Sequence, residues 1–394
     1  MCYSDSMEDF DYLSEGAVYL DSACQSLRPR PVINALERYY TEHNSCGERV
    51  KYKWGKVTDA KVEETREKTL KYLGVKAKKY TVSFTLNTTY GLNLVLSQLK
   101  PEAFSKVMTS DIEHNSPFLA TMALAARTGW PREIMERNED GTIDVSKYDF
   151  SNAVVVVNST SNFDGARTLK NIAELSKAVH KAHGILVIDA AQGTSHTVDV
   201  VRGQDYDVLC FSAHKMYGPS LGGIVWKDEL AEKIFVGFVG GGMVDDVERD
   251  KYVLSAEGKE HRYTRFEAGL MAWGEIVALG ETIDWLEKVP KSDWKCLHDN
   301  CERLFRLLDE SPKVHLVSKE PSTTMSFYVE GLDSHLLGEA LSREDIMART
   351  GYFCAHYYLD HVRKMPPLMR FSLGLHNRAS DIDKVERVLG KIIA

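Results

Sequence analysis

Short apolar runs rich in β-branched residues alternate with helix-like stretches between Tyr80 and Trp226. Several runs are almost continuously apolar, which is typical of strands that are buried on both faces of a sheet. The alternation predicts an open, mostly parallel α/β sheet, with functional groups at the carboxyl ends of its strands. We expect strands at 81–86, 106–110, 153–158, 185–189, 207–212 and 222–226, and helices at 88–98, 116–128 and 168–182.

The pattern changes on either side of this region. Before it we expect helices at 30–44 and 58–72, and after it helices at 273–287, at 294–309 and from about Ser380, with short strands at 315–318, 325–329 and 368–373. A chain of 394 residues usually forms more than one domain. We therefore predict a large α/β domain over 18–272 and a smaller α+β domain built from 1–17 and 273–394.

Composition excludes several classes of partner. The net charge of −8 without a long basic run argues against a nucleic-acid partner. No apolar stretch approaches the roughly 20 residues that span a bilayer, and the acidic N-terminus lacks the apolar core of a secretory signal. The seven cysteines are sparse and lack CxxC spacing, so we expect free thiols, no metal site and a cytoplasmic location.

Two segments place reactive side chains at expected strand ends. Lys215 follows an apolar strand and precedes a Tyr-Gly-Pro turn, within FSAHKMYGP. This segment alone leaves open a solvated loop lysine or a lysine that forms a Schiff base. Asp189 ends another apolar strand, within ILVIDAAQG, where it could cap a helix or pair with a protonated pyridine nitrogen. Both strands belong to one expected sheet, so the two side chains can converge.

This ordered pair of segments resembles the class V aminotransferases, which are pyridoxal-phosphate (PLP) enzymes of fold type I. The resemblance is strongest to their cysteine desulfurase/selenocysteine lyase branch. It extends from VYLDSACQSLRP at 18–29 to MRFSLGLHN at 369–377, nearly the whole chain. It implies a large domain with a mostly parallel seven-stranded sheet, a smaller α+β C-terminal domain, PLP as cofactor and a homodimer.

The resemblance also implies roles for residues around the cofactor ring. Lys215 would form the Schiff base with PLP, and Asp189 would hold the pyridinium nitrogen. Gln192 and Asn162 would face the phenolic oxygen of the ring. His114 would stack on the ring and move protons, although a lone histidine in its place is more often structural.

A second group is implied to bind the phosphate: Thr88, Thr89, Ser212 and His214. Thr88 and Thr89 open an expected helix directly after a strand, where free N–H groups and the helix dipole favour an anion. Without the neighbouring motifs, this Thr-Thr pair would be interpreted only as a helix cap.

Three residues near the C-terminus are implied to act on the substrate. Arg370, which could otherwise be a surface arginine, matches the arginine that binds the substrate α-carboxylate. Cys354 lies in ARTGYFCAHYY, which resembles the RTGxxCA segment whose cysteine takes up sulfur. An inert buried cysteine is the alternative. Arg349, in the same segment, would position the loop or the substrate.

Three departures from the family pattern leave the substrate less defined than the cofactor. Leu270 replaces a threonine that reaches the phosphate of the neighbouring subunit, Tyr352 and Phe353 replace histidines, and the 240–246 loop lacks an acidic residue after its glycines.

The predicted reaction converts L-cysteine or L-selenocysteine to L-alanine, with a persulfide on Cys354 and a possible acceptor protein for the sulfur. The alternatives are an aminotransferase, an epimerase or a β-eliminating C–S lyase in which Cys354 is not catalytic, and a non-catalytic subunit of the same fold.

Overall fold

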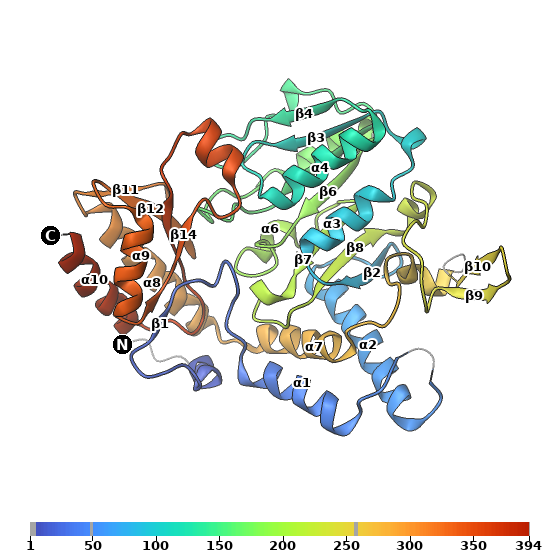
Figure 1. Cartoon of the computed structure of the whole chain (residues 1–394), viewed down its shortest axis with the longest axis horizontal. Helices are drawn as coiled ribbons and strands as arrows, with labels where there is room; N and C mark the ends of the chain where they lie inside the picture. Colours follow the sequence, from blue (N-terminus) through green and yellow to red (C-terminus); the bar gives the residue numbers. More distant parts are fainter. Residues whose placement is uncertain (1–4, 48–49, 256–258, 394) are drawn as a thin grey trace.

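A seven-stranded sheet forms the centre of the computed structural model, which describes residues 5–47, 50–255 and 259–393 (Figure 1). The strand order is β2-β8-β7-β6-β5-β3-β4. Only β8 runs antiparallel to its neighbours in this sheet. The predicted mostly parallel sheet is confirmed. Its strands are β2 (Tyr80–Thr85), β3 (Lys106–Ser110), β4 (Arg132–Met135), β5 (Ala153–Asn158), β6 (Ile185–Asp189), β7 (Val208–Ser212) and β8 (Gly222–Lys227).

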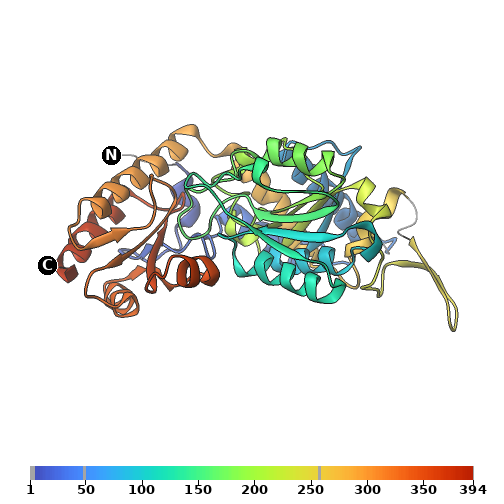
Figure 2. The same cartoon turned by 90° about the horizontal axis from the view of Figure 1, so that it is seen from above.

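Helices cover both faces of this sheet, which explains its continuously apolar strands. On β5, Val154 and Val156 pack into one hydrophobic cluster with Leu92 of α3 (Thr88–Ser97) and Leu124 of α4 (Asn115–Thr128). The alternate residues of the same strand face a second cluster, which includes α5 (Ile172–Lys181). Figure 2 shows α4 in teal on one side of the sheet and α5 in green on the other. Each β5 residue is therefore buried on one face or the other.

The C-terminal part contains a second, four-stranded antiparallel sheet in the order β11-β12-β15-β14. These strands are β11 (Val314–Leu316), β12 (Thr324–Val329), β14 (Arg349–Gly351) and β15 (Leu368–Ser372), and α8 (Lys291–Asp309), α9 (Ser334–Arg343) and α10 (Ala379–Ile393) accompany them. β1 (Val18–Tyr19) pairs in parallel with β13 (Ile346–Met347), so the N-terminal segment joins this part.

Other helices frame the large sheet. α7 (Trp273–Lys288) packs against α1 (Arg30–Glu42) and α2 (Lys53–Tyr72), and the predicted domain boundary at residue 272 stays a prediction. A hairpin of β9 (Val244–Val247) and β10 (Tyr252–Leu254) extends away from the body in both views (Figures 1 and 2). α6 (Val198–Val201) is a single short turn. No helix within the described ranges is long and apolar enough to cross a membrane.

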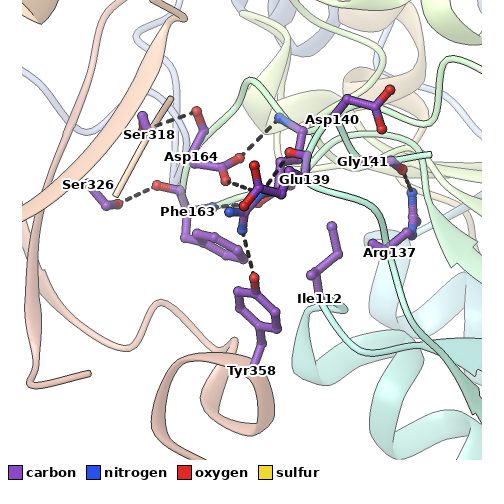
Figure 3. A network of polar contacts seen from close by, with 12 residues as sticks. Ile112, Arg137, Glu139, Asp140, Gly141, Phe163, Asp164, Ser318, Ser326 and Tyr358 are labelled. Atoms are coloured by element: carbon purple, nitrogen blue, oxygen red, sulfur yellow. Dashed lines mark hydrogen bonds and ion pairs between the residues drawn. The ribbon is translucent and has the colours of Figure 1, made fainter. Parts of the chain in front are cut away.

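A polar network fastens the C-terminal part to the loop after β5 (Figure 3). The hydroxyl of Ser326 on β12 donates to the carbonyl of Phe163, and Ser318 donates to that of Asp164. Arg167 forms an ion pair with Asp164 at 3.3 Å and donates to the Tyr358 hydroxyl at 3.0 Å. Because these contacts join both parts of the chain, they fix the neighbouring residue Asn162 relative to the C-terminal sheet.

Candidate active site

One cavity of about 260 Å³ lies at the carboxyl ends of β5, β6 and β7. The structure brings every predicted site residue to its wall, from both parts of the chain. They are Thr88, Thr89, His114, Asn162, Asp189, Gln192, Ser212, His214, Lys215, Arg349, Cys354 and Arg370. This convergence is what the predicted sheet requires, while the individual roles of these residues stay predictions.

Lys215 ends the short 3-10 turn Ala213–Lys215 that follows β7. Ser26 holds this turn, because its hydroxyl donates to the His214 carbonyl at 3.0 Å and accepts from the Tyr217 amide at 2.7 Å. The Lys215 amine forms no hydrogen bond or ion pair with any described residue. Burial lowers its pKa, against the opposing effect of the Asp189 carboxylate. The amine is therefore held at the cavity wall with a larger neutral fraction than a surface lysine has.

Asp189, the last residue of β6, is 4% exposed. Its Oδ1 accepts from the Ala191 amide at 2.9 Å. Burial raises the pKa of this carboxyl, while the Ala191 amide and Lys215 act in the opposite direction. A buried carboxylate with so few partners is costly unless a cationic or N–H group pairs with it. The carboxyl therefore suits a ligand that carries such a group.

The start of α3 forms an anion cradle. Asn87 caps the helix, because its side chain accepts from the Tyr90 amide at 3.0 Å. The Ser212 hydroxyl accepts a hydrogen bond from the Thr88 amide at 2.9 Å and lies 2.7 Å from the Thr88 hydroxyl. Gly222 allows this approach, since a Cβ there would lie 2.5 Å from the Asn87 Cα. Hydroxyls and a helix N-terminus that face one point can bind a phosphate.

His114 and Asn162 lie at the same cavity. His114 caps α4 through its Nδ1, which accepts from the Ser116 amide at 3.0 Å. Burial, followed by the positive charge of Lys215, lowers the His114 pKa to about 3, so its imidazole is neutral at pH 7. Asn162 donates to the Phe353 carbonyl at 2.6 Å, and its buried Oδ1 has no partner in the part of the chain that the structure describes. That oxygen is an unused acceptor for a ligand.

Gln192 and the two predicted arginines have protein partners at the wall. Gln192 donates to the Ala23 carbonyl at 2.7 Å. Arg349 donates to the Cys24 sulfur at 2.7 Å. Arg370 is 2% exposed and donates to the Asn162 carbonyl and to Asp21, both at 2.9 Å. Both arginines thus lie at the cavity wall, and Arg370 is paired there with a carboxylate of the chain.

Cys354 lies at a sharp turn after β14. Both Phe353 and Cys354 have positive φ, 48° and 58°, a conformation that residues other than glycine seldom adopt. The Cys354 carbonyl accepts from the Asn115 amide at 2.6 Å. Such backbone strain persists only where surrounding contacts enforce it, as they often do at functional sites.

Sequence reasoning missed several residues of the cavity wall. Asn87, Ser116, Asn158 and Thr160 follow strands or begin helices, positions that the strand pattern could have indicated. Cys24 at the wall and Asp21, which contacts Arg370, were also missed although both belong to the N-terminal motif. Their pairing with the two arginines depends on tertiary contacts that the sequence does not display. No cluster of three or more potential metal ligands occurs in the described part of the chain.

The fold and the cavity define an α/β protein with a lysine, a buried aspartate and an anion cradle at one sheet edge. The family model described as Aminotransferase class-V matches residues 18–385, so the chain belongs to that family. The family implies the cofactor PLP for this cavity.

Individual relatives agree with this family. A protein of Pyrococcus abyssi named "Probable cysteine desulfurase" is 28% identical over 97% of this chain and 95% of its own length. A Vibrio cholerae protein with the same name is 26% identical over 95% of this chain and 93% of its own length. The apo structure of a cysteine desulfurase from Thermococcus onnurineus NA1 has a TM-score of 0.86 and 27% identity, covering 100% of this chain and 99% of that one.

Proposed function

We propose that this protein is a PLP-dependent cysteine desulfurase that converts L-cysteine or L-selenocysteine to L-alanine. The observation that carries the proposal is one cavity that holds the Lys215 amine, the buried Asp189 carboxyl and Cys354. The names of the relatives support the same reaction.

The residues present fit PLP. The amine of Lys215 could react with the aldehyde of PLP. The buried Asp189 carboxyl could pair with the pyridine nitrogen, and the hydroxyls of Thr88 and Ser212 could bind the phosphate. The Asn162 Oδ1, which has no partner among the described residues, would be an acceptor within the same cavity. When bound, PLP supplies an electron sink for a carbanion at the substrate Cα.

In the proposed reaction, Lys215 and His114 transfer protons and Cys354 takes up the sulfur. Lys215, with its lowered pKa, accepts the Cα proton, and neutral His114 offers a second base. The Cys354 thiolate attacks the substrate sulfur and forms the S–S bond of a persulfide while the C–S bond breaks. The electrons of that bond remain on the substrate carbon, which takes a proton and becomes the methyl group of alanine.

A second candidate function follows from the apolar surroundings of Cys354. The Phe353 ring, 4% exposed, packs under Arg370, where the family pattern has histidine. A β-eliminating C–S lyase would release sulfide and pyruvate without the thiol. Aminotransferase or epimerase activity would likewise not require the Cys354 thiol. The same fold can support each of these reactions.

The experiment that tests the proposal incubates the purified PLP-loaded protein with a panel of L-amino acids. We expect alanine from L-cysteine or L-selenocysteine, in amounts equal to the sulfide or selenide released under reducing conditions. Pyruvate as the co-product would contradict the desulfurase assignment and support the lyase. Failure of the purified protein to gain the cofactor's visible absorbance when PLP is added would favour a non-catalytic subunit.

The proposal includes a homodimer in the cytoplasm and an acceptor protein for the persulfide sulfur. Exposed apolar side chains between residues 235 and 270 support a self-association surface: Phe235, Phe238, Val239, Val247, Tyr252, Val253 and Leu270. Leu270, in place of the family threonine, is 77% exposed, as expected if a second copy covers it. The six described cysteines are free, which supports a reducing compartment. Sedimentation analysis tests the dimer.

A further inference from the structure

The arginine predicted to bind the substrate carboxylate already has a carboxylate partner within the chain. Arg370 Nη2 donates to Asp21 Oδ1 at 2.9 Å, and its Nη1 is committed to the Asn162 carbonyl. Its Nε is buried and has no hydrogen-bond partner within the described ranges. Both terminal nitrogens of the guanidinium are therefore engaged within the chain while Asp21 stays in place, one of them by a carboxylate.

Backbone contacts hold Asp21 at this position. The chain at Asp21 forms a parallel bridge with Ser372 of β15, the strand that carries Arg370. The Ser372 amide donates to the Leu20 carbonyl at 2.8 Å, and the Ser22 amide donates to the Ser372 carbonyl at 3.2 Å. Asp21 can therefore leave Arg370 by side-chain rotation but not by movement of its backbone alone.

The two partners differ in exposure. The Asp21 side chain is 22% exposed, whereas that of Arg370 is 3% exposed. Arg370 lines the cavity, and Asp21 pairs with it from a more exposed position that is not part of the cavity lining. Two carboxylates that share one arginine repel each other, so the ligand must displace Asp21 or accept a weaker contact.

We infer that Asp21 is a specificity-determining residue, whose carboxylate competes with the α-carboxylate of the amino acid for Arg370. Asp21 neutralises Arg370 in the ligand-free site and lowers affinity for every ligand that carries a carboxylate. Burial lowers the Arg370 pKa, and the nearby Arg349 acts in the same direction. Arg349, at the same cavity wall, supplies the second positive charge that receives the incoming anion. This inference rests on the proposed PLP site but not on the identity of the product.

The test measures binding of L-alanine and of ethylamine, which has no carboxylate, to the PLP-loaded protein through the change in its visible absorbance. Asp21→Asn keeps an acceptor for Arg370 and removes the charge. We expect it to tighten L-alanine binding roughly five- to tenfold and to leave ethylamine binding unchanged. Asp21→Ser also leaves a neutral acceptor and provides the same test if the asparagine variant does not fold.

The matched control is Asp11→Asn, which removes a carboxylate that pairs with Arg30 at 2.6 Å on the exposed surface. It should change neither affinity. Unchanged or weaker binding of L-alanine to the Asp21 variants would overturn the inference, as would an equal change for ethylamine. Alanine and sulfide release from L-cysteine is assayed separately, so a failure of the proposed reaction is distinguishable from a failure of this inference.

Discussion

The Asn162 side-chain amide donates a hydrogen bond to the Phe353 carbonyl at 2.6 Å, and thereby joins the loop after β5 to the turn that carries Cys354. The Asn115 amide holds the opposite side of the turn through the Cys354 carbonyl. Two residues with positive φ are thus fixed between the two parts of the chain. The position of the thiol follows from contacts at both ends of the turn.

Asn162→Ala should therefore loosen this turn. We expect faster hydrogen exchange over 352–356, a loss of about 1 kcal/mol in the free energy of unfolding, and slower sulfur transfer. Asn171→Ala is the control, because Asn171 makes a similar bond to the Ile143 carbonyl away from the cavity. If exchange at 352–356 stays at the wild-type rate, the Asn162 contact does not hold the turn.

The sequence predicted the large sheet well because its strands carry an unambiguous apolar pattern. The expected strands at 106–110, 153–158 and 185–189 match β3, β5 and β6. The edge strand β4 was missed, because Arg132 and Glu133 interrupt its apolar pattern. Helix α9 was missed, although Asp333 caps it in the manner of an ordinary N-terminus.

The site could be predicted where residues follow strands directly, as Asp189 and Lys215 do. It could not be predicted where pairing depends on segments far apart in the sequence. Arg370 and Asp21 are 349 residues apart, and no local pattern indicates that they meet. The Tyr352–Phe353 departure could be seen in the sequence, but the positive φ of Phe353 could not.

Lys215→Ala should remove the covalent attachment of PLP and reduce turnover by at least about a thousandfold, because no neighbouring amine replaces it. Borohydride reduction followed by peptide mapping measures the attachment. Lys177→Ala, on α5 away from the cavity, should behave as the wild type. Cofactor found on another peptide would show that Lys215 is not the attachment site.

Asp189→Asn separates charge from shape. We expect turnover to fall roughly a hundredfold or more, since a neutral amide cannot stabilise a protonated ring nitrogen.

The raised pKa of Asp189 means that its ionised form destabilises the folded protein above its ordinary pKa. The cofactor-free variant should therefore melt at a higher temperature than the wild type at pH 7. A lower melting temperature would contradict this account of the carboxyl.

His376 makes folding sensitive to acid. Burial lowers its pKa to about 4, while the unfolded chain has the ordinary value near 6.5. The unfolded state thus binds a proton first as the pH falls, so stability present above pH 6.5 is lost progressively down to about pH 4. This loss amounts to at most about 3 kcal/mol. His376→Phe should make the dependence of unfolding free energy on pH less steep over that range, as measured by urea denaturation, while His196 and His214, whose pKa values burial also lowers to about 4, keep the rest of it. An unchanged slope would show that His376 does not contribute.

Cys354→Ser distinguishes the desulfurase from the lyase. If the thiol attacks the substrate sulfur, this variant should keep PLP and bind L-cysteine, because neither step uses the thiol, but it should form no persulfide and produce no alanine. Alkylation of the wild type should inactivate it faster as pH rises, since the thiolate is the reacting form. Cys46→Ser, which changes an exposed cysteine, is the control and should retain full activity. A Cys354→Ser variant that releases sulfide and pyruvate at the wild-type rate would establish elimination, a reaction that needs Lys215 and the cofactor but no thiol.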